Sequence, residues 1–490
     1  MTSVTTAPAV VEADPRRWKA LVVIAIAQLM VVLDASIVNI ALPSMQADLG
    51  ITDADRQWIV TAYTLAFGSL LLLGGRIADY AGRKRVFIVG LLGFAGASAL
   101  GGLAPTAGLL FAARGLQGVF AALLAPAALS LITVTFTDSK ERAKAFGVYG
   151  ALSGGGAAIG LVLGGVLTQY ASWHWTLLVN VPIALLAVAL AVPYVRESRA
   201  SGDTRYDVPG AIAATAGLFC LVFGITKAET DGWTGTSTVT FLSISVVLLF
   251  VFLFIEYRSS HPLLPLRIVL DRNRGGAYLA SFFVGIGLMS MFLFISFFFQ
   301  AVLQYSPLTS GLLFLPFSAG VVISAGIASQ LLPRFGPRWV TFTGFVLATT
   351  GMALFTRLTA DSTYAANVLP SIIIMSLGMG LIFVPLSATA LFGVGNHDAG
   401  VASAVLNTSQ QIGGSIGVAF LNTIAASATT AYIVANGLQG QTPEALVAGF
   451  TTTFVWSTFI LGAAGIIWVV LVRMTRRDMA SNDAVPAGMH

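Results

Sequence analysis

The chain has 490 residues, of which 56% are hydrophobic and only 10% are charged. Soluble domains average about 25% charged residues, so this composition excludes a soluble protein and predicts an integral membrane protein. The net charge of +5 is too small to indicate nucleic-acid binding, and the single cysteine, Cys220, excludes an intrachain disulfide. The polar stretch 1–17 lacks the pattern of a signal peptide and is expected to form a cytoplasmic N-terminal tail.

A helix needs about 20 mostly apolar residues to cross a bilayer. The sequence contains fourteen such segments with mostly short gaps, which predicts an all-α integral membrane protein with 14 transmembrane helices. The predicted spans are 18–42, 55–78, 86–104, 107–136, 142–168, 173–194, 207–227, 236–257, 274–303, 308–331, 338–356, 366–392, 398–428 and 446–472.

Basic residues predict the orientation, because cytoplasmic segments of membrane proteins carry an excess of Lys and Arg. If the N-terminus is cytoplasmic, nearly all of the 26 basic residues fall in cytoplasmic segments. The exceptions are Arg56, Lys227 and Arg357, which fall on the extracellular side, and Arg114, which lies within a helix. We therefore expect a multi-pass protein of the cell membrane with both termini in the cytoplasm.

The spans divide into two bundles of six helices, at 18–195 and 274–472. Between them, 196–273 holds cytoplasmic linkers and two extra transmembrane helices, and 473–490 forms a cytoplasmic tail. The stretch GGRIADYAGRKRV after the second span is echoed by ASQLLPRFGPRWV after the tenth. Two related bundles suit a transporter that rocks about a central site.

Asp34 is the only acidic residue predicted to lie well inside the bundle, where a charge is costly. Arg114 is the only base at a similar depth: the two lie ~12 Å and ~10 Å below the outer ends of their helices, and they could meet. They could form a permanent ion pair that braces the bundle. Alternatively, Asp34 could exchange a proton, because desolvation and a nearby cation change a carboxyl's proton affinity in opposite directions.

The ninth span, SFFVGIGLMSMFLFISFFFQAVLQY, is rich in Phe and Met, whose surfaces adapt to varied ligands. It also carries Gln300 and Gln304, one helical turn apart. Many of these Phe side chains could equally face lipid, whereas amides in lipid are not expected. Because drug-sized sites are mostly apolar with a few polar groups, the candidate substrate-cavity residues are Asn39, Tyr63, Gln117, Phe298, Gln300, Gln304, Asn407 and Gln411.

A short basic loop follows the second span and contains Gly82, Arg83, Lys84 and Arg85. Glycine allows a sharp turn there, and Asp79 can pair with Arg83. The loop could simply hold the topology and bind anionic lipid.

Small residues line one face of the fifth span, which allows close contact with another helix. They are Gly156, Gly160, Gly164 and Gly165. Ordinary small-residue packing and a functional glycine motif are both open interpretations of this face.

Several motifs together resemble the major facilitator superfamily, and in particular its fourteen-helix drug/proton antiporter branch, over residues 18–472. The motifs are GGRIADYAGRKRV, LDASIVNIALP in the first span, RGLQGVFAALLAPA in the fourth, GAAIGLVLGG in the fifth and WHWTLLVNVPI in the sixth. Leu161 stands where the family's antiporter glycine motif usually has Pro. The resemblance implies that Asp34 takes part in proton coupling.

The resemblance also assigns a task to the basic loop. Asp79 and Arg83, together with Asp138 and the possible further member Arg142, would form a cytoplasmic charge latch. This latch would hold the two halves together in the outward-open state.

The leading prediction is proton-driven export of lipophilic or amphiphilic compounds by alternating access, with the proton gradient as energy source and no cofactor. Export of lipids or fatty acids is the alternative. The four scattered His residues and the single Cys form no metal or nucleophile constellation, so an enzyme is not expected. No Walker-type glycine loop indicates ATP-driven transport, and the two-half design disfavours a channel. We expect small lipophilic substrates, protons and membrane lipids as partners, and function as a monomer.

Overall fold

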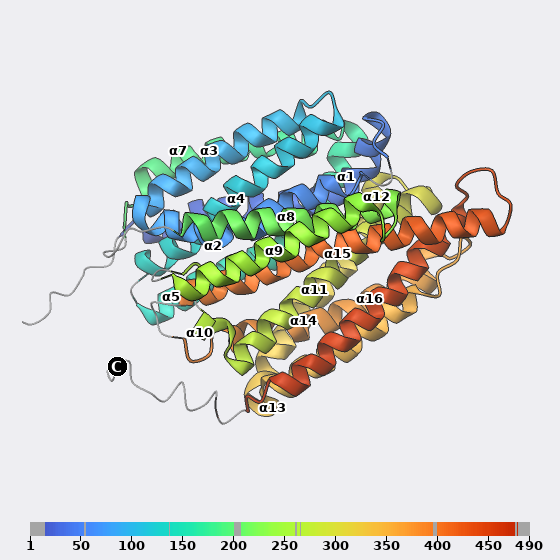
Figure 1. The fold of residues 1–490 in the computed structure, drawn as a ribbon. Coiled ribbons are helices and arrows are strands. Elements are labelled where there is room, and N and C mark those ends of the chain that lie inside the picture. Colours follow the sequence, from blue (N-terminus) through green and yellow to red (C-terminus); the bar gives the residue numbers. More distant parts are fainter. Residues whose placement is uncertain are drawn as a thin grey trace, which may run out of the picture.

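The computed structural model describes residues 15–52, 55–136, 138–199, 207–259, 262–264, 266–394, 399–475 and 478. Every regular element in these ranges is a helix, and the long helices run side by side along a common axis (Figure 1). The start of the first helix and the end of the last lie at the same end of the bundle (Figure 1). We call this the terminal end and the opposite one the far end.

The first half of the chain forms long helices that pack around a core of its own, which includes Phe87, Phe94 and Phe136. Only Val179 separates the short α6 from α7, so these two helices cover the sixth predicted span. The helices are α1 (Arg17–Asp48), α2 (Trp58–Ala81), α3 (Arg83–Gly102), α4 (Ala107–Thr135), α5 (Ser139–Tyr170), α6 (His174–Leu178) and α7 (Asn180–Tyr194).

The second half begins with the short α10 and includes two π-helical segments, η1 and η2. Within α13 the backbone leaves the helical region at Gly336, at φ 77° and ψ 164°, a conformation that glycine tolerates and other residues rarely adopt. The elements are α10 (Leu266–Val269), α11 (Arg272–Phe297), η1 (Phe298–Val302), α12 (Pro307–Leu313), α13 (Leu315–Phe355), η2 (Tyr364–Val368), α14 (Leu369–Leu391), α15 (Ala399–Ala435) and α16 (Pro443–Leu471).

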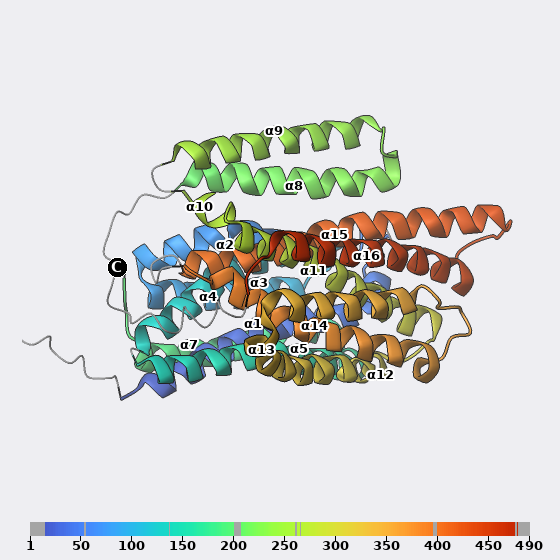
Figure 2. The same cartoon turned by 90° about the horizontal axis from the view of Figure 1, so that it is seen from below.

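Between the halves, α8 (Val208–Asp231) and α9 (Thr236–Arg258) form a hairpin along one side of the molecule (Figure 2). α8 packs against α2 of the first half and α15 of the second. Buried hydrogen bonds join it to both: Gln57 Nε2 donates to Thr226 Oγ1 at 3.3 Å, and Thr423 Oγ1 donates to Ile225 O at 3.3 Å. α8 therefore contacts both halves at once, whereas most of α9 is exposed.

In the described residues, eleven helices are long and apolar enough to cross a membrane, or up to twelve if α2 is counted as one bent span. One of the eleven is the 49-residue segment Pro307–Phe355, which includes the break at Gly336. The prediction of an all-helical, multi-pass membrane protein agrees with this finding.

Contacts between the two halves gather toward the far end of the bundle. Pro43 lies within α1 and has no N–H, so the carbonyl of Asn39 loses its helical partner. Ser296 of α11 donates its hydroxyl to that carbonyl at 2.8 Å. One residue on, Gln300 Nε2 of η1 donates to Ile40 O at 3.0 Å. A proline in the first half thus creates the acceptor that a serine in the second half satisfies.

Candidate functional site

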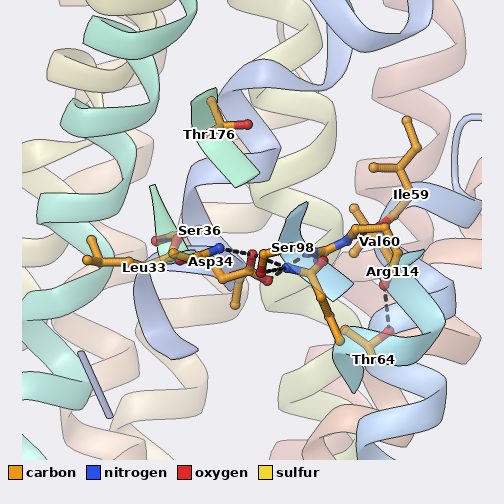
Figure 3. A network of polar contacts seen from close by, with 12 residues as sticks. Leu33, Asp34, Ser36, Ile59, Val60, Thr64, Ser98, Arg114 and Thr176 are labelled. Atoms are coloured by element: carbon orange, nitrogen blue, oxygen red, sulfur yellow. Dashed lines mark hydrogen bonds and ion pairs between the residues drawn. The ribbon is translucent and has the colours of Figure 1, made fainter. Parts of the chain in front are cut away.

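Asp34 lies in the middle of α1, and its side chain is fully buried. Its carboxylate accepts hydrogen bonds from α4 and α7 (Figure 3). Arg114 Nη1 lies 2.6 Å from Oδ2, while Gln117 Nε2 and Asn180 Nδ2 lie 2.9 Å and 2.8 Å from Oδ1. The structure therefore brings Asp34 and Arg114 into direct contact, at the shared depth that the sequence indicated.

The guanidinium of Arg114 is as deeply buried as its partner, with 1% of the residue exposed. Its Nε donates to the carbonyl of Ile59 at 2.9 Å, and Nη1 also donates to Gln117 Oε1 at 2.7 Å. The ring of Tyr63 packs 4.6 Å from its Cζ atom. A buried ion pair is tolerated only when further hydrogen bonds satisfy its remaining polar atoms, and this pair has them.

Gln117 is held in one orientation by its neighbours. Its Oε1 accepts from Arg114, and its Nε2 donates both to Asp34 and to Ser98 Oγ, which lies 2.7 Å away on α3 (Figure 3). The site therefore joins side chains from α1, α3, α4 and α7 to a backbone carbonyl of α2. We call Asp34, Arg114, Gln117, Asn180 and Ser98 the charge cluster.

Two members of the charge cluster, Asn180 and Ser98, were not predicted from the sequence. Asn180 is the one amide in the apolar stretch WHWTLLVNVPI. An amide in an apolar span is expected to face the protein interior, as for Asn407 and Gln411, so Asn180 was predictable on the same ground. Ser98 carries no such signal, because a serine in a helix can satisfy its hydroxyl on its own backbone.

Tyr63 and Asn39, two predicted cavity residues, are buried beside or near the charge cluster. The hydroxyl of Tyr63 has no hydrogen-bond partner among the described residues, and its ring covers Arg114. Asn39 Nδ2 donates to Ala35 O of its own helix at 3.1 Å. Asn39 thus lies on α1 between Asp34 and the contacts at the far end, and Tyr63 covers Arg114.

The candidates of the ninth span separate in space. Phe298 is fully buried in the apolar core, and Gln300 contacts α1. Gln304 lies beyond Val302, where η1 ends, and is exposed with φ at 55°. The expectation that Gln300 and Gln304 lie one helical turn apart is wrong, because the helix becomes π-helical and ends between them.

Asn407 and Gln411 lie one turn apart on α15. Asn407 is exposed and donates to Ser403 O at 3.0 Å, while Gln411 is half-buried and its Oε1 has no partner among the described residues. A cavity of about 150 Å³ lies elsewhere, near the far end between α15 and α16. It is smaller than a typical drug site and is lined by Arg56, Ala425, Ala426, Thr429, Thr430, Gln441, Leu446 and Phe450.

The basic loop at the terminal end turns at Gly82, whose φ is 111°. Arg83 pairs with Asp79, with Nη2 2.7 Å from Oδ1. Glu197, which sequence reasoning missed, accepts the backbone N–H groups of Lys84 and Arg85 at 3.1 Å and 3.2 Å. A carboxylate at the start of α3 fits the partial positive charge of a helix N-terminus.

The remaining latch candidates lie at the start of α5. Asp138 Oδ1 accepts the N–H of Glu141 at 2.9 Å. Glu141 in turn pairs with Arg17 at the start of α1, with Oε2 2.7 Å from Nε. Hydrogen bonding to Arg17 lowers the pKa of the Glu141 carboxyl below its usual value. The side chain of Arg142 lies outside the described residues.

The glycine face of α5 divides between two neighbours. Gly156, Gly160 and Gly164 pack against α1, and a Cβ atom at Gly164 would lie 2.8 Å from Ile37 O. A Cβ atom at Gly165 would lie 2.6 Å from the Cα of Leu308 on α12. The face therefore packs one helix of the first half closely against both α1 and the second half.

Comparison with known proteins gives consistent relatives. Residues 24–418 match the Major Facilitator Superfamily. The chain is 48% identical over 481 residues to the puromycin resistance protein pur8 of Streptomyces alboniger, covering 97% of this chain and 95% of that protein. It is 36% identical over 461 residues to the cephamycin export protein CmcT of Amycolatopsis lactamdurans, covering 93% of each.

Among solved structures, the fold is similar to a bacterial homolog of the human lysosomal transporter Spinster in an inward-facing, unoccupied conformation. The TM-score is 0.67 at 17% identity, over 95% of this chain and 98% of that one, which bears on the fold alone. The sequence relatives are transporters rather than enzymes. As its motifs predicted, the chain belongs to the Major Facilitator Superfamily.

Proposed function

We propose that this protein is a proton-coupled secondary active exporter of lipophilic or amphiphilic compounds, working as a monomer by alternating access. It lies in the cell membrane with both termini in the cytoplasm. The observation that carries the proposal is the buried Asp34–Arg114 pair within the charge cluster. The relatives support the substrate class, since one is named for resistance to puromycin and another for export of cephamycin.

Protonation of Asp34 changes the electrostatics of four packed helices. The ionised pair is neutral overall, but protonated Asp34 leaves the buried Arg114 charge without its counter-charge. Uncompensated charges in protein interiors cost about 3–5 kcal/mol. A cost of this size is sufficient to shift a conformational equilibrium when the alternative state hydrates the cluster. Proton binding and release would in this way drive the halves between two arrangements.

The contacts between the halves support one of these arrangements, closed at the far end. Ser296 and Gln300 contact α1, and the N–H of Leu308 donates to Gln169 Oε1 at 3.3 Å. With cytoplasmic termini, this state faces the cytoplasm and holds Asp34 ionised. In the opposite state, the loop that contains Asp79, Gly82, Arg83, Lys84 and Arg85 would join Asp138 and Arg142 as the latch of the terminal end.

We extend the proposal to fourteen spans in two bundles of six, with the α8–α9 pair between them. The break at Gly336 supports two crossings within Pro307–Phe355. The apolar part of α5, Gly156–Tyr170, is shorter than the other spans and supports one more. Together with α2 as a bent span, these segments account for the predicted number.

The substrate would contact α15, where Asn407 is exposed and Gln411 has an unpaired acceptor. The charge cluster nearby has one carboxylate already matched by one guanidinium. It therefore favours neutral or monocationic compounds over dications.

The test is transport in proteoliposomes with an imposed pH gradient, using puromycin, a cephamycin and a fluorescent lipid as probes. Wild-type protein should move the antibiotics in a gradient-dependent way, and Asp34→Asn should lose this movement. Asp231→Asn, the same change at the exposed acid that ends α8, should retain it. Gradient-driven transport by Asp34→Asn would contradict the proton assignment, and lipid movement alone would support the lipid exporter instead.

A further inference from the structure

Asn180, at the start of α7, carries an unpaired polar atom in the middle of the charge cluster. Its side chain is fully buried, and its Nδ2 donates to Asp34 Oδ1 at 2.8 Å. Its Oδ1 has no hydrogen-bond partner among the described residues. Buried amide oxygens are nearly always paired, so an unpaired one beside a functional carboxylate requires a physical explanation.

Gln117 provides the comparison, because it donates to the same oxygen of Asp34. Its Oε1 already accepts from Arg114 and its Nε2 also donates to Ser98, so both ends of the amide are occupied. Turning this amide over would point N–H groups at the guanidinium. Gln117 is therefore fixed as a donor, whereas turning the Asn180 amide breaks only its bond to Asp34.

An amide can serve both protonation states of a carboxyl group only if it can turn. An ionised carboxylate only accepts hydrogen bonds, whereas a protonated carboxyl also donates one. When a proton from water forms an O–H bond at Asp34 Oδ1, the Nδ2 group opposite it becomes the wrong partner. A half-turn about the Cβ–Cγ bond of Asn180 replaces Nδ2 by Oδ1 at the same position, where it accepts the new O–H.

We propose that Asn180 is a positioning residue whose side-chain amide turns over with each protonation of Asp34, donating to the carboxylate and accepting from the acid. The proposal rests on the proton-coupling role of Asp34. Arg114 stays on Oδ2 during this protonation step, one proton moves between water and Asp34 Oδ1, and no other covalent bond changes. The protonated carboxyl of Asp34 thereby finds a buried hydrogen-bond acceptor. That acceptor is Asn180 Oδ1, which is unpaired while Asp34 is ionised.

Of the other groups near Asp34 in the described structure, only the Tyr63 hydroxyl is free to accept such a hydrogen bond. Arg114 on α4 is the charged group, and it has only donors. The Tyr63 hydroxyl on α2 is the titratable group, and its lack of a partner makes it the rival acceptor. Ser98 on α3 is bound to Gln117, and α5 presents glycines to this stretch of α1.

The test is a pH titration of the purified protein in lipid by infrared difference spectroscopy, with asparagine isotope-labelled at the side-chain carbonyl. As the pH falls, the C=O band of protonated Asp34 should appear, and one asparagine amide band should move to lower frequency with the same midpoint. Both signals should vanish in Asp34→Asn, and only the amide signal should vanish in Asn180→Leu. Tyr63→Phe should retain both.

A second measurement does not depend on band assignment. Gln117→Leu removes a bond made to the carboxylate alone and should move the Asp34 midpoint by about 1–2 pH units. Asn180→Leu removes a bond from both states and should therefore move the midpoint by much less.

Titration of Asp34 with an unchanged amide band, or loss of that band in Tyr63→Phe, would overturn the role of Asn180 while leaving proton coupling in place. If instead no Asp34 band titrates and Asp34→Asn still exports along a pH gradient, the proposed function itself fails.

Discussion

Removing one partner of the Asp34–Arg114 pair should destabilise the protein more than removing both. Truncating one member of a buried ion pair costs about 3–5 kcal/mol, whereas replacing both by neutral residues is often neutral or stabilising. In Arg114→Met, Asp34 keeps two of its three hydrogen bonds, from Gln117 and Asn180. We therefore expect a loss near the lower limit, about 3 kcal/mol. The double variant Asp34→Asn/Arg114→Met should lie within about 1 kcal/mol of the wild type.

Thermal unfolding in a single detergent, followed by tryptophan fluorescence, gives the ranking of wild type, both single variants and the double variant as a double-mutant cycle. The matched control is the partly exposed pair Asp79–Arg83, whose side chains are 35% and 15% exposed. Its cycle should show a coupling below about 1 kcal/mol. If the Arg114→Met and double variants unfold at the same temperature, the uncompensated charge is not what destabilises the single variant, and the electrostatic reasoning is wrong. The double variant should fold and yet not transport.

Three further predictions concern packing and surface charge. The pKa of Glu141 is lowered by its hydrogen bonds with Arg17, so this pair should stabilise the fold above the usual pKa of 4.5 and lose that contribution as the pH falls below it. Glu141→Gln should therefore flatten the dependence of unfolding temperature on pH in that range. An unchanged profile would contradict this. Gly160→Leu should force α5 away from α1, at a cost of about 1–3 kcal/mol in stability and with loss of transport. A Cβ atom at Gly96 would meet no atom within 4 Å, so the control variant Gly96→Leu should keep normal expression and efflux. Ser296→Ala should leave the buried Asn39 carbonyl of α1 unpaired and raise the equilibrium constant for opening of the far end by about 5–150-fold. Spin labels on the two halves should then report a larger population at the longer distance. An unchanged distance distribution would refute this.

Much of the charge cluster could be predicted because helices give depth directly. Counting residues from a common surface put Asp34 and Arg114 at one level, and the structure joins them at 2.6 Å. The same count cannot give the rotation of one helix against another. Asn180 and Ser98 share that level, and the packed structure shows that α7 and α3 turn these two side chains into the charge cluster.

The fold was predicted as a class, and its local interruptions were not. Composition alone indicates an all-helical membrane protein, since apolar length requires no tertiary knowledge. The π-helical turn that begins at Phe298 moved Gln304 to the exposed end of the ninth span. The positive φ at Gly336 divides α13 between two prolines, Pro333 and Pro337. Both features depend on how the chain packs, and apolar periodicity does not report them.

α1 connects the charge cluster to the contacts between the halves. Asp34 lies five residues before Asn39, whose carbonyl is released by Pro43 and bound by Ser296 of the second half. Between these two points α5 packs against the same helix through glycines, so that a shift of α1 cannot be absorbed by flexible side chains at that contact. Under the proposed mechanism, a change in the charge of Asp34 would act on a closely packed helix whose next turn contacts the second half. The order Asp34, Asn39, Pro43 along a single helix places the carboxylate that we propose to be protonated and the carbonyl that Ser296 binds about one and a half turns apart.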